Sequence, residues 1–259
     1  MLKRRVIFTL LFFEGYFVLS RNFRLQKVGD IHWIKKNYNL KNISPFIDEL
    51  IVINLSKKID VKEFSKILRE ISTDFFIPVT AGGGIRVVDD AQYLLRSGAD
   101  KVLINNLNIE NKDELKKIST KYGKQCIVCS IDFKKNHDGN YLLFDHSKKT
   151  IIENDLEVIN RMDPNLFGDL YLNSVDRDGT GQGLDFDIVR KIPENWNNPI
   201  IITGGIGNSN HFYEGFLNKR INAVSTSNLF NFIGNGFKNV RHSLLNQDVN
   251  LVIWPKIDV

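Results

Sequence analysis

The 259-residue chain has no long hydrophobic run, only two cysteines and only six prolines. A membrane helix needs about 20 consecutive apolar residues, so we expect a protein without membrane spans. The prolines do not gather into a linker, which predicts one domain over residues 1–259 rather than two. The apolar run Val6–Phe13 follows a basic start as in a signal peptide, but Glu14 follows it directly. We therefore expect a buried strand there.

The two cysteines, Cys126 and Cys129, have the Cys-x-x-Cys spacing of some metal and redox sites. In an extended strand, residues three apart point to opposite faces, so these two thiols would not share a ligand or form a disulfide. No second pair is present to complete a zinc site. We expect neither a metal nor a cofactor, and the cysteine content is consistent with a cytoplasmic protein.

The charged residues show no concentration of one sign. Lysine and arginine number 35 against 30 acidic residues, which gives a net charge of +5. The basic residues are spread along the chain instead of forming the basic patch of a nucleic-acid groove. We expect no nucleic-acid partner.

Short apolar runs alternate with amphipathic segments along the whole chain. The best helical pattern is Asp60–Ile71, with Asp60 as N-cap and Glu63 completing a capping box. The apolar runs expected to be strands are Val6–Leu11, Leu50–Leu55, Pro78–Ala81, Val102–Ile104, Ile127–Ile131, Leu170–Leu172, Ile200–Ile202 and Ala223–Ser225. Eight strands alternating with helices in one domain predict an α/β fold, the (β/α)8 TIM barrel.

The two halves of the chain repeat each other at an offset of 121 residues (132 − 11). The offset relates Leu11 to Asp132 at the ends of equivalent strands, and Pro78 to Pro199 ahead of two glycine turns. A doubly wound sheet would not explain this repeat. We expect half-barrels of about 1–121 and 122–259, one of which has lost a carboxylate.

Glycines and polar residues follow the third, fourth, seventh and eighth expected strands. Such turns let backbone N–H groups approach an anion at the start of the next helix. The alternative is that they are only tight turns, but their repeat-related positions favour two phosphate sites. The candidate phosphate-binding residues are Gly83, Gly84, Asn105 and Asn106 in the first half, and Gly204, Gly205, Ser227 and Asn228 in the second.

Six motifs, in order and in register with the strands, resemble the cyclase subunit of imidazole glycerol phosphate synthase, the HisF family. They are Phe46–Leu50, Ala81–Ile85, Ser97–Val102, Ser130–Asp132, Ser174–Thr180 and Thr203–Gly205. The resemblance implies a two-phosphate half-barrel duplication. It also implies that ammonia comes from a HisH-like glutaminase partner and is used to cleave and cyclise a phosphorylated ribulosyl-aminoimidazole precursor.

The catalytic pair that the resemblance implies is incomplete. The family uses two aspartates as general acid and base, and an acid–base group contributes about two to four powers of ten in rate. Asp132 keeps one role, whereas Leu11 stands at the other position and cannot carry a proton. We expect strongly reduced cyclase activity unless water or Asp178 substitutes.

At the opposite ends of the strands, the resemblance implies a ring of salt bridges that gates ammonia. Charges at strand starts are otherwise often solvated and of little consequence. The expected ring consists of Arg5, Glu49, Lys101 and Asp169, and Asp48 and Asp100 beside it are expected to help dock the partner.

A complete gate with a broken acid–base pair resembles one branch of the family, as do Leu10-Leu11 and Val28-Gly29-Asp30. That branch is found with a glutaminase and an ATP-dependent amidotransferase that builds acetamidino groups on sugars of bacterial surface polysaccharides. The resemblance therefore favours an ammonia-conducting subunit. Two alternatives stay open: a cyclase of histidine biosynthesis that tolerates Leu11, and a phosphate-ligand-binding barrel without catalysis.

Overall fold

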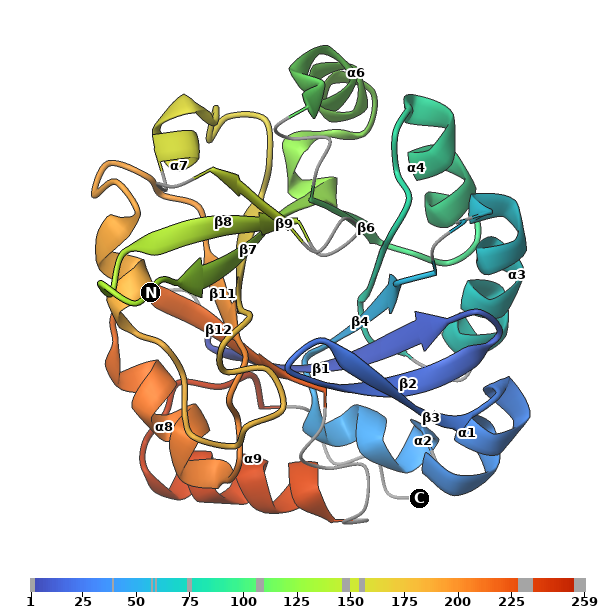
Figure 1. The fold of residues 1–259 in the computed structure, drawn as a ribbon. Coiled ribbons are helices and arrows are strands. Elements are labelled where there is room, and N and C mark those ends of the chain that lie inside the picture. Colours follow the sequence, from blue (N-terminus) through green and yellow to red (C-terminus); the bar gives the residue numbers. More distant parts are fainter. Residues whose placement is uncertain are drawn as a thin grey trace.

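In the computed structural model, eight parallel strands close into a barrel that helices surround (Figure 1). The structure describes residues 3–38, 40–56, 58, 60–73, 76–105, 110–145, 150–153, 157–227 and 235–253. The barrel strands are β1 (Arg5–Phe13), β4 (Glu49–Asn54), β5 (Val79–Gly82), β6 (Lys101–Ile104), β7 (Ile127–Lys135), β10 (Asp169–Ser174), β11 (Ile200–Thr203) and β12 (Ile221–Thr226). Every expected strand is present, and the pairing of β7 with β10 closes the circle. The predicted (β/α)8 barrel is confirmed.

Helices fill the connections between the strands. They are α1 (Ile31–Tyr38), α2 (Leu40–Ile43), α3 (Val61–Ser72), α4 (Val88–Leu95), α6 (Lys112–Tyr122), α7 (Glu157–Arg161), α8 (Ser209–Leu217) and α9 (Gly236–Asn246), with short 3-10 helices η1 (Ser44–Phe46), η2 (Lys124–Cys126) and η3 (Asp187–Lys191). Asp60 caps α3 as predicted and accepts the N–H groups of Lys62 and Glu63. The Glu63 carboxylate bonds Lys66 instead of forming a capping box. Among the described residues, no helix is long and apolar enough to cross a membrane.

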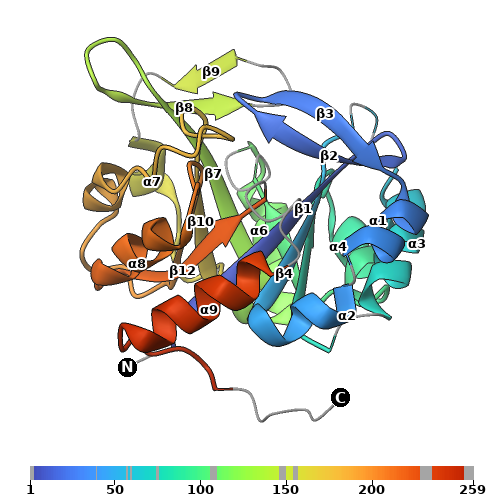
Figure 2. The same cartoon turned by 90° about the horizontal axis from the view of Figure 1, so that it is seen from below.

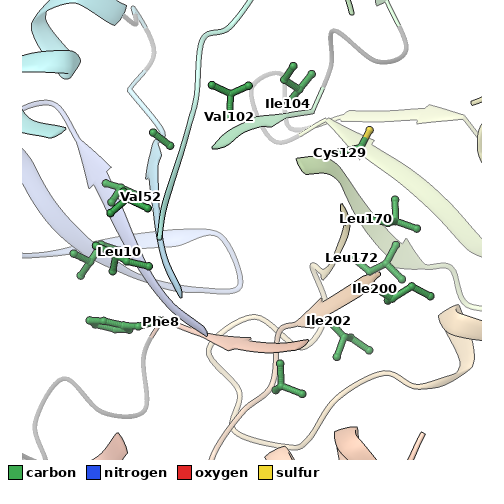
Figure 3. Packing of buried hydrophobic residues seen from close by; sticks show 14 of the residues in the cluster. Phe8, Leu10, Val52, Val102, Ile104, Cys129, Leu170, Leu172, Ile200 and Ile202 are labelled. Atoms are coloured by element: carbon green, nitrogen blue, oxygen red, sulfur yellow. The ribbon is translucent and has the colours of Figure 1, made fainter. Parts of the chain in front are cut away.

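The strands are buried on both faces, which is why most of their central residues are apolar and do not alternate with polar ones. Successive side chains alternate between the two faces. On β1, Phe8 and Leu10 point outward toward the helices, as do Leu170 and Leu172 of β10 (Figure 3). The inward-facing residues form a separate cluster inside the barrel: Ile7, Ile51, Leu103, Val128, Tyr171, Ile201 and Ala223.

Strands β1 and β7 run on past the barrel, and each continues into an antiparallel hairpin. The first hairpin is β2 (Tyr16–Arg21) with β3 (Arg24–Gly29), and the second is β8 (Tyr141–Asp145) with β9 (Thr150–Glu153). Both lie at the end of the barrel opposite the chain's N-terminus (Figure 2). We call this end, where the barrel strands finish, the mouth. Equivalent hairpins on β1 and β7 agree with the half-barrel repeat.

The sequence anticipates only part of these hairpins. The β7–β8 turn at Asp138-Gly139 has the composition of a hairpin turn, and Gly139 has φ of +80°. The β2–β3 turn consists of Asn22 and Phe23 at φ of +50° and +59°. Phenylalanine rarely adopts this conformation, and most of β3 is exposed, so neither turn residues nor apolar periodicity mark this hairpin.

The two cysteines are free thiols. The expectation that both lie in one strand is wrong for Cys126, which lies in η2 before the strand begins. Cys129 lies in β7 with its thiol in the outward-facing cluster. Among the described residues, no group of three or more His, Cys, Asp or Glu side chains could hold a metal ion.

Candidate functional site

Four charged side chains from four strands meet at the end of the barrel opposite the mouth, which we call the base. Arg5 donates to Glu49 at 2.8 Å and to Asp169 at 2.6 Å. Lys101 lies 2.8 Å from Asp169 and 3.4 Å from Glu49. The ring is thus closed, with each cation between the same two anions. The structure brings together all four residues named from the sequence.

The ring is shielded from solvent, which strengthens the attraction between its opposite charges. The side chains of Glu49 and Asp169 are 2% and 7% exposed, and those of Arg5 and Lys101 are each 20% exposed. Burial alone would raise the pKa of Asp169, but Arg5 and Lys101 outweigh it and hold that pKa below its usual value. Burial would likewise lower the pKa of Arg5, but the two carboxylates raise it above its usual value. Thr80, which the sequence analysis did not single out, donates its hydroxyl to Glu49 at 2.6 Å.

The two aspartates expected to dock a partner both bond neighbouring strands. Asp48 accepts the Val6 N–H at 2.8 Å, and Asp100 accepts the Val79 N–H at 2.8 Å. Asp48 is also buried against Arg241 of α9 at 3.1 Å. The Asp48 carboxylate is therefore bonded within the chain, and of these two aspartates only Asp100 is exposed. The docking role stays a prediction.

At the mouth, Asp132 is buried and held by two amides. Asn105 donates to one carboxylate oxygen at 2.8 Å, and Asn173 donates to the other at 2.6 Å. Asn173 is the residue paired with Asp132 across β10 and β7. Asn173 was not among the residues expected from the sequence, although an amide at the end of a strand is the signal that could have marked it.

Leu11 lies on the inward face of β1, because it has the same parity as Arg5, Ile7 and Thr9. It pairs with Val18 of the first hairpin and with Ile53 of β4. The mouth therefore has a fixed carboxylate on β7 and a half-buried aliphatic side chain at the repeat-related place on β1.

Asp178 is tied to the first hairpin. Its carboxylate accepts the Ser20 hydroxyl at 2.5 Å and the Phe23 N–H at 3.0 Å. Burial raises the pKa of Asp178, and these two hydrogen bonds offset part of that rise. The geometry gives Asp178 a structural task, since it fixes the β2–β3 turn over the mouth. Its acid–base role stays a prediction.

The glycine turns have backbone conformations that glycine adopts readily and other residues rarely do. Gly83 and Gly204 have φ of +103° and +94°, and the following Gly84 and Gly205 have +75° and +96°. A side chain at Gly83 would collide with the Asn54 carbonyl, so glycine is required there. The two pairs are repeat-related.

The polar residues expected beside these turns are placed only in part. Asn105 directs its amide to Asp132, and Ser227 directly follows β12 and is half-buried. Asn106 and Asn228 lie outside the described residues. Phosphate binding stays a prediction.

A closed barrel of eight parallel strands, with a buried charged ring at one end and polar strand ends at the other, defines the class: a (β/α)8 barrel. Residues 17–232 of the chain match the sequence model of a protein family that is described as 'Histidine biosynthesis protein'. The chain belongs to this family and, within it, to the HisF-like proteins.

The relatives match over almost their whole length. A protein of Parasynechococcus marenigrum (strain WH8102), provisionally named imidazole glycerol phosphate synthase subunit hisF2, is 42% identical over 98% of this chain and 96% of its own. The HisF subunit of Pelodictyon phaeoclathratiforme (strain DSM 5477 / BU-1) is 32% identical over 98% of this chain and 100% of its own. The HisF subunit of Chlorobium limicola (strain DSM 245 / NBRC 103803 / 6330) is 35% identical over 90% of this chain and 92% of its own.

Proposed function

We propose that this HisF-like barrel activates a HisH-like glutaminase and conducts the ammonia it releases to another enzyme. That enzyme is an ATP-dependent amidotransferase that forms acetamidino groups on sugars for surface polysaccharide. The observation that carries the proposal is the contrast between the two ends of the barrel. The ring at the base is complete, whereas the mouth has one carboxylate where the cyclase chemistry calls for two.

The ring suits the entry of a small neutral molecule. Four alternating charges satisfy one another, so an ion that entered would have to displace an existing partner. Ammonia is uncharged and needs no such exchange. The inward-facing residues beyond the ring are mostly aliphatic, which disfavours ions further.

The mouth suits delivery better than ring closure. Ring closure with bond cleavage needs protons to be both given and taken, and positioned groups carry them. Asp132 is fixed by two amides, and Leu11 supplies no second group. Asp178 is occupied with the hairpin.

The second candidate is the imidazole glycerol phosphate synthase cyclase of histidine biosynthesis. The names of the relatives favour it, as do the retained Asp132 and the paired glycine turns. In this reading Asp132 would act with water in place of the second carboxylate.

Two measurements separate the candidates. The glutaminase is assayed alone and with an equimolar amount of the chain, and the proposal expects faster glutamine hydrolysis and a stable complex. The chain is then given ammonium chloride and the ribulosyl-aminoimidazole precursor, and the proposal expects almost no cyclised product. Rapid turnover there would establish the cyclase instead. If the chain neither binds the glutaminase nor stimulates it, the remaining hypothesis is the phosphate-ligand-binding barrel without catalysis.

A further inference from the structure

Strand β3 of the first hairpin has a neighbouring strand on one edge only. In the part of the chain that the structure describes, it pairs with β2 and with no other strand. Residues 24–27 are all exposed, so both faces of β3 meet solvent along this stretch. By contrast, β2 buries Phe17, Val18 and Ser20. The outer edge of β3, which faces away from β2, is therefore open to pairing with a strand of another chain.

The turn of the hairpin determines which backbone groups point to the outer edge. Both residues of the β2–β3 turn have positive φ, as in a two-residue type I′ turn. The residues that flank it, Arg21 and Arg24, face each other, and in such a turn they form a hydrogen-bonded pair. Hydrogen-bonded pairs alternate with non-bonded pairs along an antiparallel ladder. The N–H and C=O groups of Leu25 and Lys27 therefore point away from β2.

The side chains around the outer edge are basic and partly apolar. Arg21, Arg24 and Lys27 are exposed, and β3 contains no acidic residue. The Lys27 ammonium lies 4.0 Å from the centre of the Tyr16 ring. Tyr16 and Leu25 are themselves among the exposed large hydrophobic residues. This composition suits a partner strand that has both carboxylates and apolar side chains.

The charges disfavour a second copy of this chain as the partner. Pairing two copies through β3 would bring Arg21, Arg24 and Lys27 of each copy together, and neither β3 strand has a carboxylate to offset them. Like charges across paired strands are destabilising, and lysine on an edge strand discourages pairing of identical edges. An acidic strand of another protein gains attraction at the same positions.

The outer edge lies close to the mouth. Leu11 of β1 pairs with Val18 of β2, and Val18 pairs with Lys27 of β3, so the three form one row across the strands. Paired strands lie about 4.8 Å apart, which puts the Lys27 backbone roughly 10 Å from that of Leu11. Figure 2 shows this hairpin at the mouth end of the barrel. Asp178 accepts the N–H of Phe23 in the turn, which fixes the hairpin relative to the mouth.

We propose that the outer edge of β3 docks an acidic β-strand of the enzyme that receives the ammonia. This inference rests on the proposed function, which supplies the acceptor enzyme. The backbone groups of Leu25 and Lys27 pair with the incoming strand, and Arg24 and Lys27 attract its carboxylates. Strand addition of this kind takes its affinity from main-chain hydrogen bonds and its specificity from side chains. Docking beside the mouth shortens the path of ammonia through water, where protonation would end its nucleophilicity.

The test follows single amide protons by hydrogen exchange in the complex of the chain with the glutaminase, before and after the amidotransferase is added. Without the amidotransferase, the outward N–H groups of Leu25 and Lys27 should exchange fast. The Gln26 N–H points to β2 and should exchange slowly throughout. Adding the amidotransferase should slow exchange at Leu25 and Lys27 by roughly tenfold or more and leave Gln26 unchanged.

Two variants and a control separate strand pairing from a general effect of charge. Arg24→Glu combined with Lys27→Glu should weaken binding of the amidotransferase roughly tenfold at low salt. Leu25→Pro removes an outward N–H that the hairpin itself does not use, and it should weaken binding at least as much. Lys116→Glu combined with Lys191→Glu changes the net charge equally at exposed lysines of α6 and η3, and should bind as the parent does. Glutamine hydrolysis should be the same in all of them.

The outcomes are distinct. If the amidotransferase binds but leaves exchange at Leu25 and Lys27 unchanged, docking on β3 is overturned while the proposed function stands. Parental binding by the charge-reversed variant would also overturn it, and this variant decides alone if fast exchange at Gln26 shows that Leu25→Pro has lost the hairpin. Protection of both amides in the chain alone, with a doubled mass in ultracentrifugation, would make a second copy the occupant. If the amidotransferase neither binds nor receives nitrogen, the proposed acceptor is wrong, and the docking site fails with it.

Discussion

Replacing Glu49 by alanine removes one of the two anions that both cations of the ring share. In the parent chain Glu49 contacts Arg5 at 2.8 Å, Lys101 at 3.4 Å and the Thr80 hydroxyl at 2.6 Å. In the variant, two cations share Asp169 alone, so a positive charge is left without its partner. Breaking a buried ion pair costs about 3–5 kcal/mol, and the 20% exposure of both cations puts this case near 3.

A loss of that size weakens the barrel without unfolding it. Domains are stable by roughly 5–15 kcal/mol, and for a chain of this length 1 kcal/mol lowers Tm by about 2–4 °C. We therefore expect Tm to fall by roughly 6–12 °C. The Glu49→Gln variant keeps an oxygen for Thr80 but not the charge, so its Tm should lie between those of the parent and the alanine variant.

The functional consequence is measured in the complex with the glutaminase. With the ring broken, ammonia escapes at the base, so glutamine-supported product should fall while ammonium-supported product is retained. Glu63→Ala is the matched control, because Glu63 pairs with Lys66 in an exposed position and should affect neither quantity. An unchanged Tm together with unchanged glutamine-supported product in Glu49→Ala would refute the reasoning.

Three further predictions concern the mouth and the ring. Leu11→Asp should raise ammonium-dependent cyclase turnover by roughly two powers of ten, and Leu11→Asn should not; equal activity of the two would contradict a missing proton carrier. Asp178→Ala should release the β2–β3 hairpin and speed trypsin cleavage at Arg21 and Arg24, whereas Asp178→Asn keeps the oxygen acceptor and should resist trypsin as the parent does. Equal digestion of the two variants would show that Asp178 does not hold the hairpin. The lowered pKa of Asp169 means that its contribution to stability is present above the unfolded value of about 4 and is lost as the pH falls through the folded value. Unfolding curves of the parent and Asp169→Asn should therefore converge in acid, and parallel curves would count against the ring.

The sequence specifies much of this protein because the strand period is two. Burial on both faces made each strand an apolar run, so eight runs and a half-chain repeat were enough for the barrel. The same period placed Arg5 and Leu11 on one face of β1, six residues apart. A charge at one end of a strand and an aliphatic residue at the other could thus be assigned to opposite ends of the barrel.

Periodicity gives the face of a side chain but not its neighbours, and those only the tertiary structure decided. Asp48 looked like a surface charge, yet α9 brings Arg241 against it from 193 residues away. Asn173 looked like one more residue at the end of a strand, and its amide gained a partner only when the pairing of β10 with β7 placed Asp132 beside it. Asp178 holds the β2–β3 turn, because that turn, which no sequence signal marks, folds back and donates the Phe23 N–H to its carboxylate. In each case the partner comes from a distant part of the chain, and closing the barrel brings the two together.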